Sequence, residues 1–153
     1  MENRTKEIVK TVLLYGMIAF YIFGGYNHFR DPAFYIPLIP PYLAAWAVEL
    51  NLLSGVFEIG LALLLIPTQT RKYAGWGIVL MLIAFIPSHI YFIQRGTFSL
   101  GTFTMNPMIS WIRLLVFQPL FIVWALWVSK GKSGRRGVDI RLILFCMSPF
   151  FHP

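Results

Sequence analysis

The sequence predicts an all-α fold, a bundle of four transmembrane helices with both termini in the cytoplasm. Four apolar runs of roughly 18 to 22 residues recur along the chain, which is the length a helix needs to cross a bilayer. The composition agrees, because 58% of the 153 residues are hydrophobic and only 12% are charged. So few charged groups cannot cover the surface of a soluble protein of this size. The chain is therefore expected to lie in the lipid bilayer.

The basic residues predict the topology. They gather before the first run, between the second and third runs, and after the fourth: Arg4, Lys6, Lys10, Arg71, Lys72, Lys130, Lys132, Arg135, Arg136 and Arg141. Cytoplasmic segments of membrane proteins are enriched in Lys and Arg, so these three segments are expected in the cytoplasm of a multi-pass protein of the cell (inner) membrane. Because the net charge of +7 lies at the ends of apolar runs, it does not indicate a nucleic-acid partner.

The four spans are predicted at residues 9–26, 44–66, 73–93 and 107–128. Gly24 and Gly25 in the first span are small residues that allow a neighbouring helix to approach closely. The outer loop that follows is rich in proline and aromatic residues and is expected to fold back onto the membrane interface. Pro87 breaks the third span near its outer end, where freed carbonyls need another donor. Pro107 is a suitable first residue for the fourth helix.

Residues 1–132 are predicted to form the four-helix domain, and residues 133–153 a separate basic and apolar tail. The apolar part of the tail is about a dozen residues long, too short to span a bilayer. It fits either an interfacial segment against anionic lipid or a tail without fixed structure. Cys146 is the sole cysteine, which excludes an intramolecular disulfide and a CxxC redox pair.

Glu58, deep inside the second apolar run, is the candidate catalytic residue. Counting about 1.5 Å per residue places it some 20 Å from the outer end of its span, while His28 lies at the outer mouth. Asn51 and Glu58 project within about 20° of each other, and Glu49 projects to the opposite side. An acid at this depth is expected to face the bundle interior. Glu49 is expected to reach lipid headgroups or Arg113.

The fourth span carries a polar stripe in its outer half, formed by Asn106, Ser110, Arg113 and Phe117. Arg113 needs an anion, and its depth favours Glu49 or a bound ligand over Glu58, about 12 Å deeper. The ligand-pocket candidates are His28, Asn51, His89, Ser110 and Arg113. Two histidines and a distant acid do not have the spacing of a metal site, so no metal is predicted. The alternative is a purely structural role, in which Glu58 only holds two helices together by hydrogen bonding.

Several segments together resemble the DoxX-like membrane protein family. They are Asn27-His28-Phe29 followed by Pro32, the pair Pro40-Pro41, the run from Leu53 to Gly60 that contains Glu58, Arg71-Lys72, and the run from Phe85 to Tyr91. The likeness covers about residues 15–128. It implies a compact four-helix bundle with Glu58 as the hallmark acid. It also implies association with membrane redox systems, such as thiosulfate:quinone oxidoreductase subunits and partners of thiol-handling enzymes.

Three functions follow as hypotheses. The first is a redox-associated subunit that binds a quinone or a partner oxidoreductase, with Glu58 accepting a proton. The second is a binder or isomerase of a lipid-like small molecule, similar to the emopamil-binding and sigma-2 receptor bundles. The third is a membrane assembly factor, which docks through its aromatic outer loop. The expected partners are the lipid bilayer and either a partner oxidoreductase or further copies of this chain in a homo-oligomer. No nucleotide loop and no nucleophile with a base occurs in the sequence, so it leaves open whether the protein is an enzyme.

Overall fold

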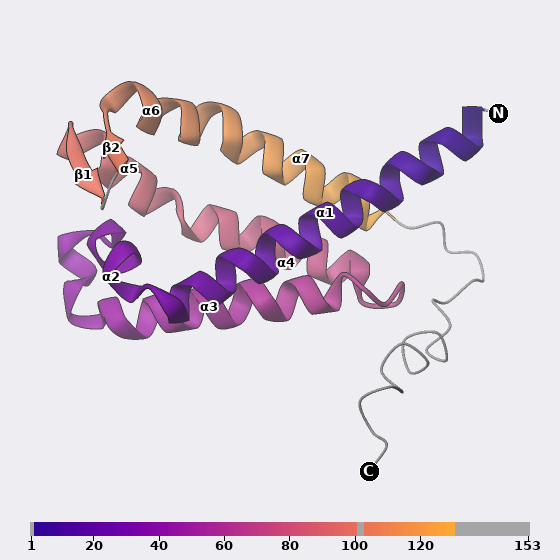
Figure 1. The fold of residues 1–153 in the computed structure, drawn as a ribbon, viewed down its shortest axis with the longest axis horizontal. Coiled ribbons are helices and arrows are strands. Elements are labelled where there is room, and N and C mark those ends of the chain that lie inside the picture. The colour runs from indigo at the N-terminus through magenta and orange to yellow at the C-terminus, as the bar shows by residue number, and fades with distance from the viewer. Residues whose placement is uncertain (1, 101–102, 131–153) are drawn as a thin grey trace, which may run out of the picture.

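The computed structural model describes residues 2–100 and 103–130, and these form a bundle of long helices (Figure 1). The predicted tail 133–153 lies outside the described residues. The long elements are α1 (Glu2–Arg30), α3 (Ala47–Leu64), α4 (Arg71–Ala84) with α5 (Ile86–Arg95), and α6 (Pro107–Ile112) with the π-helix η3 (Arg113–Phe117) and α7 (Gln118–Ser129). Four helical stretches, Arg4–Arg30, Pro41–Leu64, Arg71–Arg95 and Pro107–Ser129, are long and apolar enough to cross a membrane. The predicted helical bundle is thus confirmed.

One end of the bundle, called here the hairpin end, is closed by short elements. The proline-rich connection after α1 forms α2 (Pro32–Tyr35), η1 (Ile36–Leu38) and η2 (Pro41–Trp46). The connection before α6 forms an antiparallel hairpin of β1 (Phe98–Leu100) and β2 (Phe103–Met105), between the third and fourth predicted spans, where no strand was predicted. Buried side chains of Phe92, Phe98 and Met105 join the hairpin to α5.

The opposite end, called the turn end, is held by polar contacts to helix-terminal carbonyls. Arg71 donates from Nε to the Leu65 carbonyl and from Nη2 to the Ile66 carbonyl, both at 2.8 Å. The ammonium of Lys10 on α1 donates to the carbonyl of Lys130, just after α7. These cations satisfy carbonyls that a helix C-terminus leaves without an intrahelical donor. They fix α4 to the end of α3, and α1 to the end of α7.

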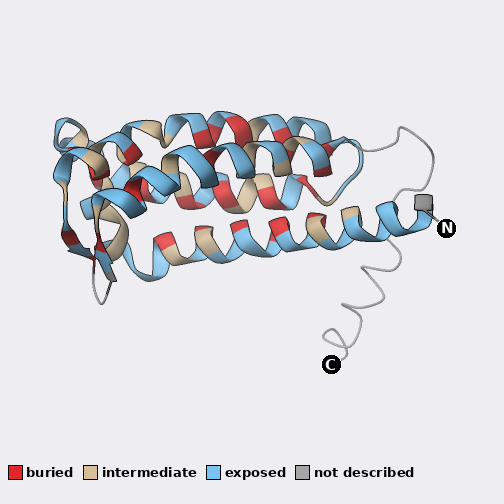
Figure 2. Ribbon diagram, turned by 90° about the horizontal axis from the view of Figure 1, so that it is seen from above, coloured by how far each residue is buried: buried red, intermediate tan, exposed pale blue. Residues whose placement is uncertain are grey.

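The buried residues follow the inward faces of the helices, while the outward faces are exposed (Figure 2). The core at the turn end contains fully buried Met17, Leu65, Ile78 and Val128. Large apolar side chains such as Phe23 and Leu80 remain exposed. In water such a surface would be unstable, whereas in a bilayer it faces acyl chains.

Two prolines interrupt the regular helices at positions that matter for the interior. Pro87, near the start of α5, marks the break from α4 at Phe85, and the Gln118 side chain donates to the Leu82 carbonyl beside that break. Pro119 lies just after η3, where the backbone N–H of Gln118 donates to the carbonyl of Arg113, five residues earlier in the chain. Because proline has no N–H to donate, the helix widens locally instead of losing its ladder.

The backbones of α1 and α3 approach each other closely at a pair of glycines. A methyl group built on Gly25 would lie 2.8 Å from the Gly55 carbonyl oxygen, and one built on Gly55 would lie 2.9 Å from the Gly25 carbonyl oxygen. Since real Cβ atoms do not approach backbone oxygens so closely, only glycine fits at both positions. The small residues expected in α1 therefore do mark a helix contact.

We predict that Gly55→Ala destabilises the protein by about 1–3 kcal/mol, because the added methyl group forces α1 and α3 apart. Thermal unfolding of the detergent-solubilised protein measures the effect. Gly60→Ala on the same helix is the control, since nothing lies within 4 Å of a Cβ built there. Equal melting temperatures for the two variants would contradict the close crossing.

Candidate functional site

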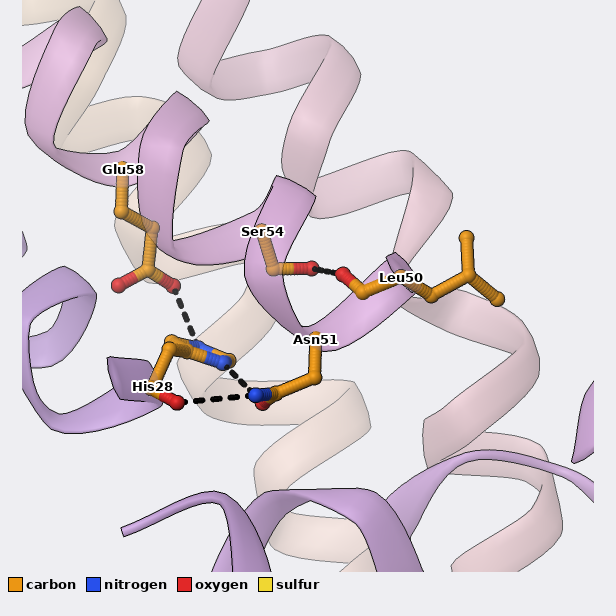
Figure 3. A network of polar contacts seen from close by, with 5 residues as sticks. All are labelled: His28, Leu50, Asn51, Ser54 and Glu58. Atoms are coloured by element: carbon orange, nitrogen blue, oxygen red, sulfur yellow. Dashed lines mark hydrogen bonds and ion pairs between the residues drawn. The ribbon is translucent and has the colours of Figure 1, made fainter. Parts of the chain in front are cut away.

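A polar network in the interior joins α1 to α3 (Figure 3). The Nε2 atom of His28 lies 3.6 Å from Oε1 of Glu58. On the other side of the ring, Nδ1 lies 2.8 Å from Oδ1 of Asn51, and the Asn51 amide nitrogen donates to the His28 carbonyl at 2.9 Å. His28, Asn51 and Glu58 are all buried. The three side chains therefore form one connected unit.

Asn51 fixes the tautomer of His28. Because the Asn51 nitrogen donates to the His28 carbonyl, its Oδ1 must face Nδ1, and this oxygen can only accept. The proton of a neutral His28 is thus assigned to Nδ1, which leaves the lone pair of Nε2 directed at Glu58. One further proton can reside either on Nε2 or on the Glu58 carboxylate. The basic nitrogen and the carboxylate therefore face each other across 3.6 Å.

Gly24 leaves space for the Glu58 carboxylate, because it has no side chain. A Cβ built on Gly24 would lie 2.7 Å from Oε2 of Glu58, so any side chain here would displace that oxygen. Tyr21, one turn earlier on the same face of α1, is buried with a hydroxyl that has no hydrogen-bond partner among the described residues. Tyr21, Gly24, Gly25 and His28 follow the spacing of one helix face, which explains why one helix supplies this whole wall.

Tyr35 from α2 covers the histidine. Its ring centroid lies 3.9 Å from that of His28, with an angle of 31° between the planes. Burial, followed by the negative charge of Glu58, raises the pKa of the Tyr35 hydroxyl above its usual value. Tyr35 therefore keeps its proton. The sequence analysis missed this residue, because the proline-rich segment was expected to lie on the membrane interface.

The depth expected for His28 was wrong. It was placed at the outer mouth with Glu58 far below it, yet the two side chains are in contact. That expectation took the outer ends of all four spans to lie at the same depth in the bilayer. In the structure His28 lies close to the end of α1, whereas Glu58 lies eleven positions after the start of α3 at Ala47. Thus α3 extends beyond α1 toward the hairpin end, and α2 and η1 lie in the space that this leaves.

A cavity of about 580 Å³ lies beside the network. Its polar lining comes from several helices: His28, Tyr35, Asn51, Ser54, Glu58, Ser88, His89 and Arg113. The remaining lining is apolar and comes mainly from α3, α4 and the η1–η2 segment. The volume falls in the range of small-molecule sites, about 300–1,000 Å³, and the mixture of an apolar wall with a few polar groups is typical of them.

His89 and Arg113 both line the cavity. Among the described residues no ion pair joins Arg113 to Glu49, one of the two anions considered for it, and the Glu49 side chain is exposed. The Arg113 guanidinium lies instead 5.9 Å from the centre of the Phe92 ring. His89 is buried, and its Nδ1 has no hydrogen-bond partner within the described part of the chain.

Ser110 does not contribute to the cavity. It is fully buried, its hydroxyl donates to the Asn106 carbonyl at 3.2 Å, and it is not one of the described residues that line the cavity. Ser110 lies in the regular helix α6 and bonds back to its own helix, so of the two pocket candidates on the polar stripe of the fourth span only Arg113, at the start of the π-helix η3, lines the cavity. Within residues 2–100 and 103–130, no group of three or more His, Cys, Asp or Glu side chains could hold a metal ion.

Comparisons with known proteins add a family but no activity. No curated protein and no solved structure matches the chain. A family model, DUF8561, matches residues 17–129, from the middle of α1 to the end of α7, and thus covers all four long helical stretches and the polar network. The chain belongs to this family, which is described as a domain of unknown function.

Proposed function

We propose that the protein is integral to the cell (inner) membrane, with both termini and the turn after α3 in the cytoplasm. Four helices of spanning length support the membrane assignment. The basic residues support the orientation, because Arg4, Lys6, Lys10 and Arg71 lie at the turn end. The hairpin end then faces outward, and the cavity lies in the outer half of the bilayer.

We further propose a redox-associated role, in which the cavity binds a quinone headgroup and the His28–Glu58 pair exchanges a proton with it. The observation that carries this proposal is a buried acid–base pair, 3.6 Å apart, on the wall of an otherwise mostly apolar cavity. Buried ionisable groups in membrane helices are costly and are usually functional. The resemblance to DoxX-like proteins also points to membrane redox systems.

Reducing a quinone to a quinol adds two electrons and two protons. A partner oxidoreductase would supply both electrons. The His28–Glu58 pair would pass one proton to a quinone oxygen, take up another from water, and pass that second proton to the other quinone oxygen. Asn51 holds the imidazole so that Nε2, and not Nδ1, exchanges the proton.

A second candidate is binding or isomerisation of a lipid-like small molecule. It is favoured by the apolar lining of the cavity, which would suit a hydrocarbon skeleton as well as a quinone. An isomerase of this kind would use the same acid–base pair to move a proton between carbon atoms. Mass spectrometry of the molecule retained after purification separates the two, because a quinone and a sterol-like lipid differ in mass.

We predict that Glu58→Gln preserves quinone binding but lowers the rate of quinone reduction by about 100-fold or more. Glutamine has the shape of glutamate, but its side chain cannot accept and release a proton as a carboxylate does. The rate is measured with decyl-ubiquinone, after the chain and the oxidoreductase that co-purifies with it have been reconstituted together in membranes. A Glu58→Gln rate equal to that of the native protein would exclude a proton role for this residue. Survival of the partner's activity without quinone binding would indicate an assembly factor.

We predict that Gly24→Ala lowers the same reduction rate by about tenfold or more, because its methyl group displaces Oε2 of Glu58 and disturbs the contact with His28. The carboxylate is the flexible end of a side chain, so the fold should survive, and an unchanged melting temperature would check this. Gly60→Ala is again the matched control. If both variants reduced quinone at the native rate, the space at Gly24 would have no part in the reaction.

A further inference from the structure

The cavity reaches the outer surface between α3 and α4. Leu53 and Phe57 on α3 and Leu80 on α4 all line it, yet their exposed fractions are 51%, 53% and 65%. Residues that both line a cavity and lie on the outer surface form its rim. The opening therefore lies on the lipid-facing side of two neighbouring helices, and in a bilayer it faces acyl chains.

The polarity of the cavity changes along the helix axes. Toward the turn end its lining contains Leu61, Gly77 and Leu80, which carry no polar side-chain atoms. Glu58 lies one turn from Leu61 toward the hairpin end, and Asn51 lies two turns further. A molecule that fills the cavity therefore meets polar groups at one end and only hydrocarbon at the other. The site thus suits an amphipathic ligand, with a polar head and an apolar tail.

Gly77 sets the shape of the apolar end. A Cβ built there would lie 2.4 Å from Cδ2 of Leu61, so the glycine leaves room for the leucine methyl group between the helices. That methyl group is the end of a flexible side chain and can rotate. The apolar end of the cavity is thus bounded by movable hydrocarbon between α3 and α4, and no backbone carbonyl closes it in this position.

We propose that this opening is a lateral portal, through which a quinone with a long hydrocarbon tail enters from the bilayer and leaves its tail between α3 and α4. This inference rests on the proposed function and narrows its substrate class to lipid-soluble, tailed quinones. The polar head lies at the His28–Glu58 pair, and the tail passes Phe57, Leu61 and Leu80. Because lipid is as apolar as the portal, tail selectivity comes from packing and steric fit and not from leaving water.

The test blocks the portal without touching the polar network. Leu80→Trp places a large ring at the rim, while Ile83→Trp adds the same ring to α4 at an exposed position that does not line the cavity. Equilibrium binding to the protein in nanodiscs is measured for decyl-ubiquinone and for its tail-free headgroup, 2,3-dimethoxy-5-methylbenzoquinone. We expect Leu80→Trp to weaken decyl-ubiquinone binding about tenfold, with headgroup binding unchanged. Ile83→Trp should bind both as the native chain does.

Two results would overturn the portal: unchanged decyl-ubiquinone binding by Leu80→Trp, or an equal loss of both quinones, which would place the damage at the headgroup site. Melting temperatures of the variants show whether either change comes from misfolding. If the native chain binds neither quinone, the proposed redox function fails. In that case native mass spectrometry decides on the portal separately. A tailed lipid retained by the native chain and by Ile83→Trp but lost from Leu80→Trp would support it, and equal retention or its complete absence would refute it.

Discussion

The close crossing of α1 and α3 at Gly25 and Gly55 is the contact on which the rest of the interior depends. Lipid gives two helices no hydrophobic reason to associate, so close packing and hydrogen bonds must hold them together. At this crossing each glycine faces the carbonyl of the other helix. The same approach brings the His28 carbonyl within reach of the Asn51 amide, and the imidazole within reach of Glu58. Packing and the polar network are thus one structure.

This crossing also explains how the membrane interior accommodates Glu58. An isolated acid there would be left without partners, at a cost of about 2.5–3.5 kcal/mol on insertion scales. His28 offers a basic nitrogen, and Gly24 leaves room for the second carboxylate oxygen. Asn51 in turn fixes the histidine. The carboxylate is thus held by groups from α1 and α3, and its position depends on the crossing of these two helices.

The sequence predicted features that depend on one helix at a time. The lengths of the apolar runs gave the four spanning helices, and the helical period placed Asn51 and Glu58 on one face, where both are buried. Predictions that depend on the relative position of two helices along the bundle axis were wrong, or were not made at all. Contact between His28 and Glu58 follows from the offset of α1 and α3, and Tyr35 reaches the site because the proline-rich segment folds into short helices. Neither the offset nor that fold has a periodic signal.

The position of the cavity follows from where the bundle packs tightly and where it does not. α1 with α3 and α4 with α7 are the two most extensively packed helix pairs, and the second pair is close enough that a Cβ on Gly75 would lie 2.4 Å from the Ser129 side chain. The cavity lies where these pairs meet, along the less extensive interface of α3 with α4, near the break at Pro87 and the start of η3 at Arg113. The His28–Glu58 pair therefore belongs to a tightly packed interface that fixes its geometry. The opening belongs to a looser interface, where side chains can move aside for a ligand without disturbing that geometry.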